Sequence, residues 1–245
     1  MAEQTIVESV KHEPASIARK RSPFFVVFAC VMLLLVIAGF TRTFYLRSFF
    51  STEPLAIYIQ VHGVVLTAWF MLFLLQTILI RQHRPGIHRR FGFIGVTIAA
   101  AVVAISLFTL VNVYPLSAAL GYEVDLAGSA RMAQMTRDLF LLSAFPVLIV
   151  LAVVFRRRSQ AHKRLMLLAS ISLLPAAVGR IFRWPALSDI PEAPATLGLI
   201  LALVVAVAVH DLVARKQIHP VVAWGGPIYF LWLIVGALLV EYVVT

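Results

Sequence analysis

Long apolar stretches separated by short polar ones recur along the whole chain. Within a stretch, apolar and polar positions do not alternate as they do in the strands of a membrane β-barrel. Most stretches are long enough for a helix to cross about 30 Å of hydrocarbon. Because a chain in lipid must satisfy its own backbone polar groups, such stretches predict transmembrane helices. Seven spans are expected, at residues 23–40, 55–80, 91–113, 139–155, 165–182, 196–213 and 223–244.

Composition agrees with this pattern. The 245 residues are 61% hydrophobic and 13% charged, whereas a soluble domain carries about 25% charged residues. We therefore expect an all-α fold, a single polytopic transmembrane helical bundle at residues 23–245, preceded by a polar cytoplasmic tail at residues 1–22. This tail is too long and too polar for a cleavable signal peptide, so the first span is expected to be retained. Cys30 is the single cysteine, which excludes an internal disulfide.

The net charge of +10 comes from basic residues that gather on one side of the expected bundle. If the N-terminus is cytoplasmic, 15 of the 21 Lys and Arg residues fall on the cytoplasmic side, and the other 6 fall on the opposite side. This asymmetry follows the positive-inside rule. It predicts a cytoplasmic N-terminus and, with seven spans, a C-terminus on the opposite side of the membrane. The charge then orients the protein and contacts anionic lipid, and it does not indicate binding to nucleic acid.

Polar side chains at membrane depth are costly, so each one is a candidate functional residue. His62, Trp69 and Gln76 recur every seven residues in the second span. Seven residues make nearly two helical turns, so these three side chains are expected to form a polar stripe on one helix face. Two interpretations stay open. The stripe forms a site for a cofactor, a quinone or a proton, or it makes hydrogen bonds between helices.

Arg180 is expected near the outer end of the fifth span, at a depth similar to that of His62. Its guanidinium suits a carboxylate or a phosphate, which it can bind through two hydrogen bonds. The alternative is a salt bridge to Asp138, at the outer start of the fourth span. His162 lies 18 residues before Arg180, which is five helical turns, so the two would share a face of one straight helix.

His88, His162 and His210 are expected on the cytoplasmic side, each where a basic turn meets an apolar stretch. Imidazoles from separate helices can bind a transition metal ion, and two of them can ligate a haem. The chain has no local metal-binding motif of the H-E-x-x-H or C-x-x-C-H kind, so a site would have to form between helices. His83 and His219 lie in the turns themselves and are expected to be solvated.

The turns RQHRPGIHRRFG and RRRSQAHKRLM resemble each other. Aligning His88 with His162 also aligns Arg84 with Arg158 and Arg90 with Arg164. Two interpretations stay open: a weak internal repeat, as in other membrane bundles built from repeated helix pairs, or the general need of short cytoplasmic turns for Lys and Arg.

The order of these features also carries a resemblance. His62 comes early in an apolar helix, Gln76 precedes a basic turn, and HRRFG (88–92), AHKRLM (161–166) and Arg180 follow. This order resembles uncharacterised bacterial inner-membrane families and, more distantly, is similar to the cytochrome b561 and ferric-reductase type of transmembrane bundle. The similarity covers about residues 55–183. It implies histidine ligands from different helices and haem b as a cofactor. The cytochrome b561 family has a histidine pair near each face, whereas His62 is the only histidine in the outer half here, which puts a second haem in doubt.

These observations favour a bacterial inner-membrane protein with a haem- or metal-dependent redox or electron-transfer role. His88, His162 and His210 would be ligand candidates, and His62, Gln76 and Arg180 would line an outer-side pocket for a quinone headgroup. A membrane redox protein would be the partner. Two alternatives stay open: a non-enzymatic transporter or small-molecule-binding protein that uses the same polar stripe, and an accessory subunit of a membrane complex.

Overall fold

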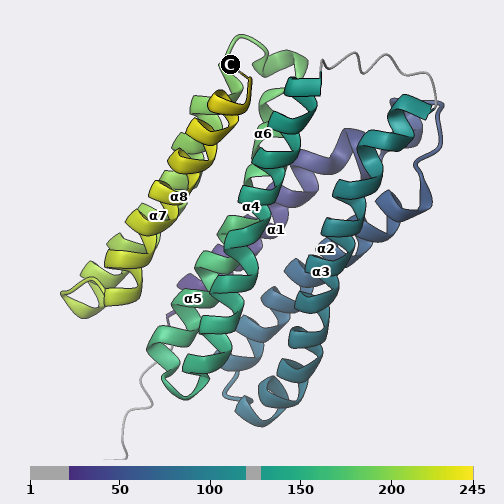
Figure 1. The fold of residues 1–245 in the computed structure, drawn as a ribbon. Coiled ribbons are helices and arrows are strands. Elements are labelled where there is room, and N and C mark those ends of the chain that lie inside the picture. Colours follow the sequence, from purple (N-terminus) through teal and green to yellow (C-terminus); the bar gives the residue numbers. More distant parts are fainter. Residues whose placement is uncertain (1–21, 120–127, 245) are drawn as a thin grey trace, which may run out of the picture.

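The structure, a computed structural model, describes residues 22–119 and 128–244, which form a bundle of helices (Figure 1). Within these ranges the chain forms no strand. The α-helices are α1 (Phe24–Phe40), α2 (Ile57–Arg81), α3 (Pro85–Ala119), α4 (Gly128–Val154), α5 (Ser159–Ser172), α6 (Pro175–Phe182), α7 (Glu192–Arg215) and α8 (Pro220–Val244). The expected polar tail, except for Ser22, lies outside the described residues.

The outside of the bundle is apolar. Among the described helices, 6 are long and apolar enough to cross a membrane, and there are up to 7 such spans if α5 and α6 together count as one. Large apolar side chains point outward from them, for example Leu34, Phe93 and Val213, which are 63%, 79% and 71% exposed. A surface of this kind is unfavourable in water and suits lipid. The expected all-α polytopic transmembrane bundle is therefore confirmed.

The turns rich in Lys and Arg lie together at one end of the bundle, which we call the basic end. The α2–α3, α4–α5 and α7–α8 turns are there, and α1 begins there (Figure 1). The α6–α7 connection and the last turn of α8 lie at the opposite end, which we call the far end (Figure 1).

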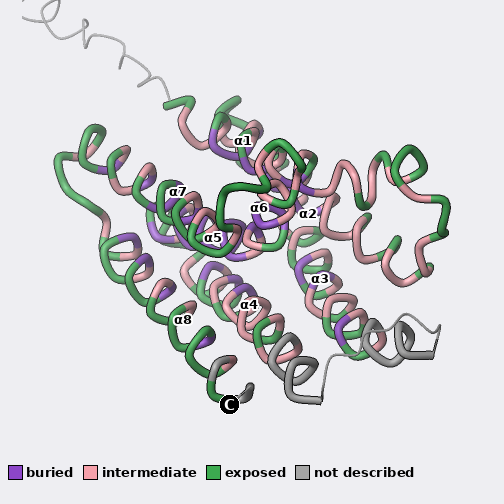
Figure 2. The backbone as a smooth tube through the Cα atoms, turned by 90° about the horizontal axis from the view of Figure 1, so that it is seen from above, coloured by how far each residue is buried: buried purple, intermediate pink, exposed green. Residues whose placement is uncertain are grey.

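Helices α5 and α6 lie in the middle of the bundle, with the other helices around them (Figure 2). In α5, all residues from Leu165 to Ser172 are buried except the half-buried Met166. The surrounding helices contribute core residues such as Met32, Phe70, Phe145 and Ile200. Because protein surrounds α5, a polar group on this helix needs a protein partner or a buried ligand rather than bulk water.

The fifth span is broken rather than straight. Helix α5 ends at Ser172, α6 begins at Pro175, and the two are bent by 42°. Proline lacks an N–H group and clashes with the preceding helical turn, so it is well tolerated at the first position of a new helix. The expected single helix at residues 165–182 is therefore wrong, and His162 and Arg180 do not share a face of one straight helix. Pro146, in contrast, lies inside the continuous helix α4.

Helix α3 begins at Pro85, several residues earlier than expected. Proline favours the first helical position because its fixed φ angle suits a helix and its missing N–H is not needed there. His88 therefore lies in the first turn of a helix and not in a loop. His162 is likewise in the first turn of α5.

Candidate functional site

Several buried polar atoms in the described part of the chain have no hydrogen-bond partner. Three of them belong to the polar stripe of α2: Nδ1 of His62, Nε1 of Trp69 and Oε1 of Gln76. Nδ1 of His88, at the start of α3, is a fourth. Buried polar atoms in proteins are normally paired, so atoms without a protein partner mark places where water or a ligand can bind. These atoms of the stripe do not make the hydrogen bonds between helices that one interpretation expected.

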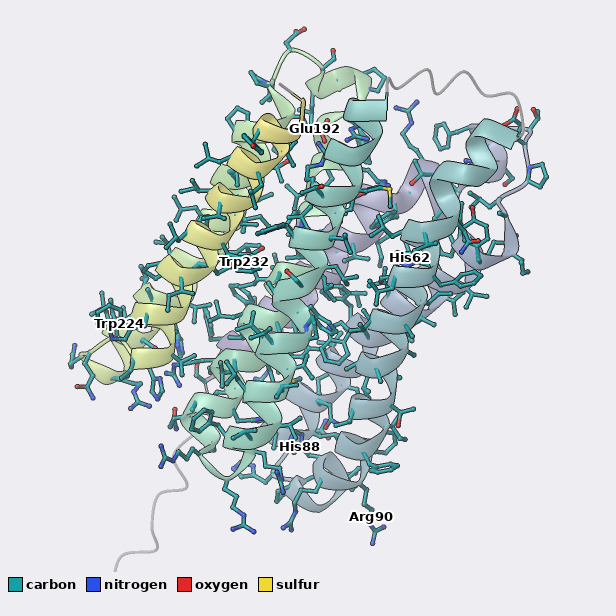
Figure 3. The ribbon with its side chains drawn as sticks, in the orientation of Figure 1. His62, His88, Arg90, Glu192, Trp224 and Trp232 are labelled. Atoms are coloured by element: carbon teal, nitrogen blue, oxygen red, sulfur yellow. The ribbon has the colours of Figure 1, made fainter. Side chains whose placement is uncertain are left out.

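His62 and Arg180 lie in the far half of the bundle, on α2 and α6 (Figure 3 shows His62). The Arg180 guanidinium carbon is 4.7 Å from the centroid of the Phe40 ring on α1, and Nη1 donates to the Ala176 carbonyl at 2.8 Å. The two residues thus lie in the same half of the bundle, and a ligand shared between them stays a prediction.

The expected salt bridge between Arg180 and Asp138 does not form. Nε of Arg137 lies 3.9 Å from the Asp138 carboxylate. The nearby Glu192 accepts two hydrogen bonds from Arg183, each 2.7 Å long. These bonds hold the pKa of Arg183 above its ordinary value. Among the described residues, no carboxylate accepts a hydrogen bond from Arg180. Some of its guanidinium N–H groups are therefore available to a ligand.

Gln76 does not lie in the far half with His62. The two residues are on one continuous helix, and their separation of fourteen positions corresponds to about 21 Å of helix. Gln76 lies near the basic end of α2, which ends at Arg81. The expectation that Gln76 lines an outer pocket together with His62 and Arg180 is therefore corrected: the stripe has one face but spans most of the membrane.

His88 and His162 are neighbours at the basic end. Their ring centroids are 6.4 Å apart and the rings are nearly perpendicular, at 79°. Nδ1 of His162 is 2.8 Å from the Ala152 carbonyl on α4. A ring nitrogen that faces a carbonyl carries the proton, so the other nitrogen of a neutral imidazole keeps a free lone pair. Metal-binding histidines are commonly oriented in this way, by donating their second N–H group to a carbonyl.

His210 has different neighbours. Its ring stacks on Phe24 with a centroid distance of 4.0 Å, and Nε2 is 3.4 Å from Oγ of Ser22. Nδ1 is 3.7 Å from the Asp211 carboxylate. Within residues 22–119 and 128–244, no three His, Cys, Asp or Glu side chains are arranged to hold a metal ion. The structure therefore pairs His88 with His162 and does not add His210 to form a three-histidine group.

The sequence interpretation missed an ion pair between α5 and α7. Arg164 and Asp211 are both completely buried, with 0% exposure. Nε of Arg164 donates to Oδ2 of Asp211 at 2.7 Å, and Nη2 donates to Oδ1. Oδ2 also accepts the backbone N–H of His219 at 3.2 Å. A single carboxylate within an apolar span was a signal that could have predicted a basic partner, because an unpaired charge there is unfavourable.

His219 and His83 differ, although both lie in turns. His83 is exposed, as expected. His219 is half-buried, and its Nδ1 accepts the backbone N–H of Val221 at 3.1 Å, which caps the start of α8. Burial holds the pKa of His219 below 6.5, and the positive charges of Arg164 and Arg215 lower it further. The expectation that His219 is solvated is therefore only partly met.

The resemblance between the two basic turns stops at the histidines. His88 and His162 occupy matching positions in the first turn of a helix. Arg90 points away from the bundle into the surroundings (Figure 3), whereas its counterpart Arg164 is completely buried. The aligned arginines therefore have different roles.

No protein-family model matches this sequence, and no curated protein or solved structure is significantly similar to it. The functional assignment therefore depends on how the chain's own polar side chains are arranged.

Proposed function

We propose that this membrane-embedded bundle is a bacterial inner-membrane redox protein that holds a haem or a transition metal ion at His88 and His162. The observation that supports it is the position of the two imidazoles. They come from different helices, their ring centroids are 6.4 Å apart, and the Ala152 carbonyl orients the His162 ring. With the basic end in the cytoplasm, as the positive-inside rule expects, this pair lies on the cytoplasmic side.

The residues present fit such a group. Neutral imidazoles from two helices are the ligands that haem iron and other transition metals commonly take in proteins. The buried Nδ1 of His88 has no protein partner, so its lone pair is available to a metal. A bound haem or redox-active metal would supply the ability to accept and release an electron. The chain's own contribution is to bind the group, to orient both rings and to exclude bulk water.

The far half supplies the second part of the proposal. His62 and Arg180 offer an imidazole nitrogen and guanidinium donors that no protein acceptor uses fully. Such groups suit the carbonyl oxygen of a quinone headgroup or another small oxygen-rich molecule. A quinone there would lie in the opposite half of the bundle from the histidine pair.

A second class of function is favoured by one observation. The unpartnered atoms of His62, Trp69 and Gln76 follow the length of α2. A non-enzymatic transporter or small-molecule-binding protein would use such a row of hydrogen-bonding groups without any cofactor. An accessory subunit remains the third class, and it would need none of these groups.

The decisive experiment is the visible absorption spectrum of the purified protein, together with its content of bound metals. A haem absorption band, or stoichiometric iron, copper or zinc, supports the redox proposal. The protein is purified from cells that are supplied with iron and haem. If it then contains neither haem nor a bound metal, the result contradicts this proposal and favours the transporter or binding-protein alternative.

A further inference from the structure

At the basic end, the described Lys and Arg residues other than Arg164 have no carboxylate partner, and among them only Lys163 of α5 and Arg215 of α7 are half-buried rather than exposed. Neither forms a salt bridge within the described residues. Asp211 is the only carboxylate that the described chain places at this end, and Arg164 binds both of its oxygens. The other described carboxylates belong to the far end: Glu53, Asp138, Asp189 and Glu192.

Both cations are held in place. The side-chain oxygen of Gln160 accepts a hydrogen bond from Arg215 at 2.7 Å and one from Arg164 at 3.0 Å. Nε of Arg215 is buried and has no partner. The Lys163 ammonium lies 4.4 Å from the centroid of the Phe25 ring on α1. Helices α1, α5 and α7 thus fix two positive groups, and one of them has an unused donor.

The surroundings of these cations are electropositive. Half-buried His219 lies in the turn between α7 and α8. The described charged residues around His219 include three cations, Arg164, Arg215 and Lys163, and one carboxylate, Asp211. The single carboxylate does not neutralise all three positive charges. This excess of positive charge favours the binding of a negatively charged group.

The neighbouring surface is apolar. Helix α7 exposes Val209, Leu212 and Val213 just before Arg215, at 50%, 45% and 71%. Cations at a helix end beside such a surface lie at the boundary between headgroups and hydrocarbon. A phosphate that carries acyl chains fits this arrangement, because its chains cover the apolar face of α7.

We propose that Lys163 and Arg215 bind the phosphate group of an acidic phospholipid at the basic end of the bundle. Basic pockets between transmembrane helices recognise lipid headgroups in this way. The proposal goes beyond the redox role and does not depend on it, because no cofactor takes part in the binding.

Native mass spectrometry of the full chain in detergent tests this. Phosphatidylglycerol is titrated into the protein, with zwitterionic phosphatidylcholine as the comparison lipid. The test variants are Lys163→Gln, Arg215→Gln and the double variant. The matched control is Arg156→Gln with Lys216→Gln, which removes two exposed charges from the same end.

Each basic group near a membrane surface contributes about fivefold to the binding of an anionic lipid. We expect phosphatidylglycerol binding to fall about fivefold in each single variant and about 25-fold in the double variant. The control pair should bind as the wild type does. Equal losses in the control pair, or equal binding of both lipids by the wild type, would show a non-specific charge effect and overturn the proposal. Displacement of phosphatidylglycerol by millimolar inorganic phosphate would assign the site to a soluble phosphate and also overturn it.

A second measurement covers the case in which a variant folds poorly. The pKa of His219 is followed by NMR in the wild type, with and without phosphatidylglycerol. A bound phosphate should raise this pKa towards 6.5, because its negative charge stabilises the protonated imidazole. A pKa that does not change when phosphatidylglycerol is added in excess would contradict a site at this position.

Discussion

Arg164 of α5 and Asp211 of α7 form an ion pair that no solvent reaches, 47 residues apart in the sequence. The pair links the central helix of the bundle to α7. Through the backbone N–H of His219 it also fixes the turn that leads into α8. Arg164 makes two further hydrogen bonds to Gln160, at 2.8 Å to the main-chain oxygen and 3.0 Å to the side-chain oxygen. This network holds three helix ends together at the basic end.

Removing one member of this pair should strongly destabilise the protein. Asp211→Asn leaves the Arg164 charge buried without a counter-charge, and the expected loss in the free energy of unfolding is about 3–5 kcal/mol. Thermal unfolding followed by circular dichroism in detergent measures it. The double variant Arg164→Met with Asp211→Leu leaves no buried charge, so it should recover much of the loss. A double variant as unstable as Asp211→Asn would contradict this explanation, and Arg156→Gln, an exposed position, serves as the unaffected control.

The histidine pair predicts a selective loss of any bound haem or metal. His162→Ala removes a ring that the Ala152 carbonyl orients, so the cofactor content should fall to near zero. The control is His83→Asn. His83 has a φ angle of 59°, a left-handed conformation that Asn tolerates well. Absorption spectra and metal analysis of both proteins decide the matter. Equal loss in both variants, or retention in both, would argue against His162 as a ligand.

Much of the fold could be predicted from the sequence because lipid leaves few structural choices. Uninterrupted apolar stretches must be helices, so the bundle and most span boundaries follow from hydropathy. The break between α5 and α6 could not be predicted in this way. Pro146 stays inside a helix, whereas Pro175 starts a new one. A proline inside a helix leaves one main-chain carbonyl without its N–H partner. Whether the helix continues or breaks depends on whether neighbouring groups donate a hydrogen bond to that carbonyl.

The candidate site was predictable only in part, because helical periodicity gives a face but not a partner. It placed His62 and Gln76 on one face of α2, and the helical rise, which separates them by about 21 Å, already excluded a shared outer pocket. The partner of Asp211 depends on which helix packs against α7. A single sequence does not show which helices pack against each other. The sequence pattern drew attention to Arg164 only because it aligns with Arg90. In the structure Arg164 is buried and Arg90 is exposed, so their surroundings are opposite.

His219 predicts a loss of stability at mildly acidic pH. Its folded pKa lies below 6.5, because burial and the charges of Arg164 and Arg215 oppose protonation. As the pH falls below 6.5, the unfolded chain therefore binds a proton more readily than the folded protein, and stability decreases. The contribution is fully present above pH 6.5 and is lost as the pH falls towards the folded pKa.

His219→Asn isolates this contribution. Asn is a favoured residue before a helix and can accept the Val221 N–H in place of the imidazole, so the cap is kept. Midpoints of thermal unfolding are measured between pH 8 and 5 for both proteins. The difference between variant and wild type should move in favour of the variant as the pH falls. A difference that does not change with pH would show that His219 is not the responsible group.

The orientation of the bundle predicts where its turns are accessible. Reporter fusions after His83 and after Arg157 fall in the basic turns before α3 and α5, and they should report the cytoplasm. A fusion after the last residue of α8 should report the periplasm. The reason is the asymmetry of Lys and Arg between the two ends. A periplasmic signal from either basic turn would reverse the proposed orientation and move the His88–His162 pair to the other side.

The far-half pocket predicts that Arg180 binds an oxygen-rich ligand together with His62. Arg180→Gln removes a charge that pairs with no carboxylate among the described residues, so the affinity for a quinone analogue should fall about tenfold or more. Arg183→Gln is the matched control, since it removes a charge at the same end whose side chain is 59% exposed and already paired with Glu192. An exposed pair of this kind contributes little, so the control should bind as the wild type does. Quenching of intrinsic tryptophan fluorescence by the quinone analogue measures both affinities.

His62→Phe should weaken binding to a similar extent, because it keeps the ring volume and removes the unpartnered Nδ1. If Arg180→Gln weakens binding and His62→Phe does not, the two residues serve separate purposes and the shared pocket is wrong.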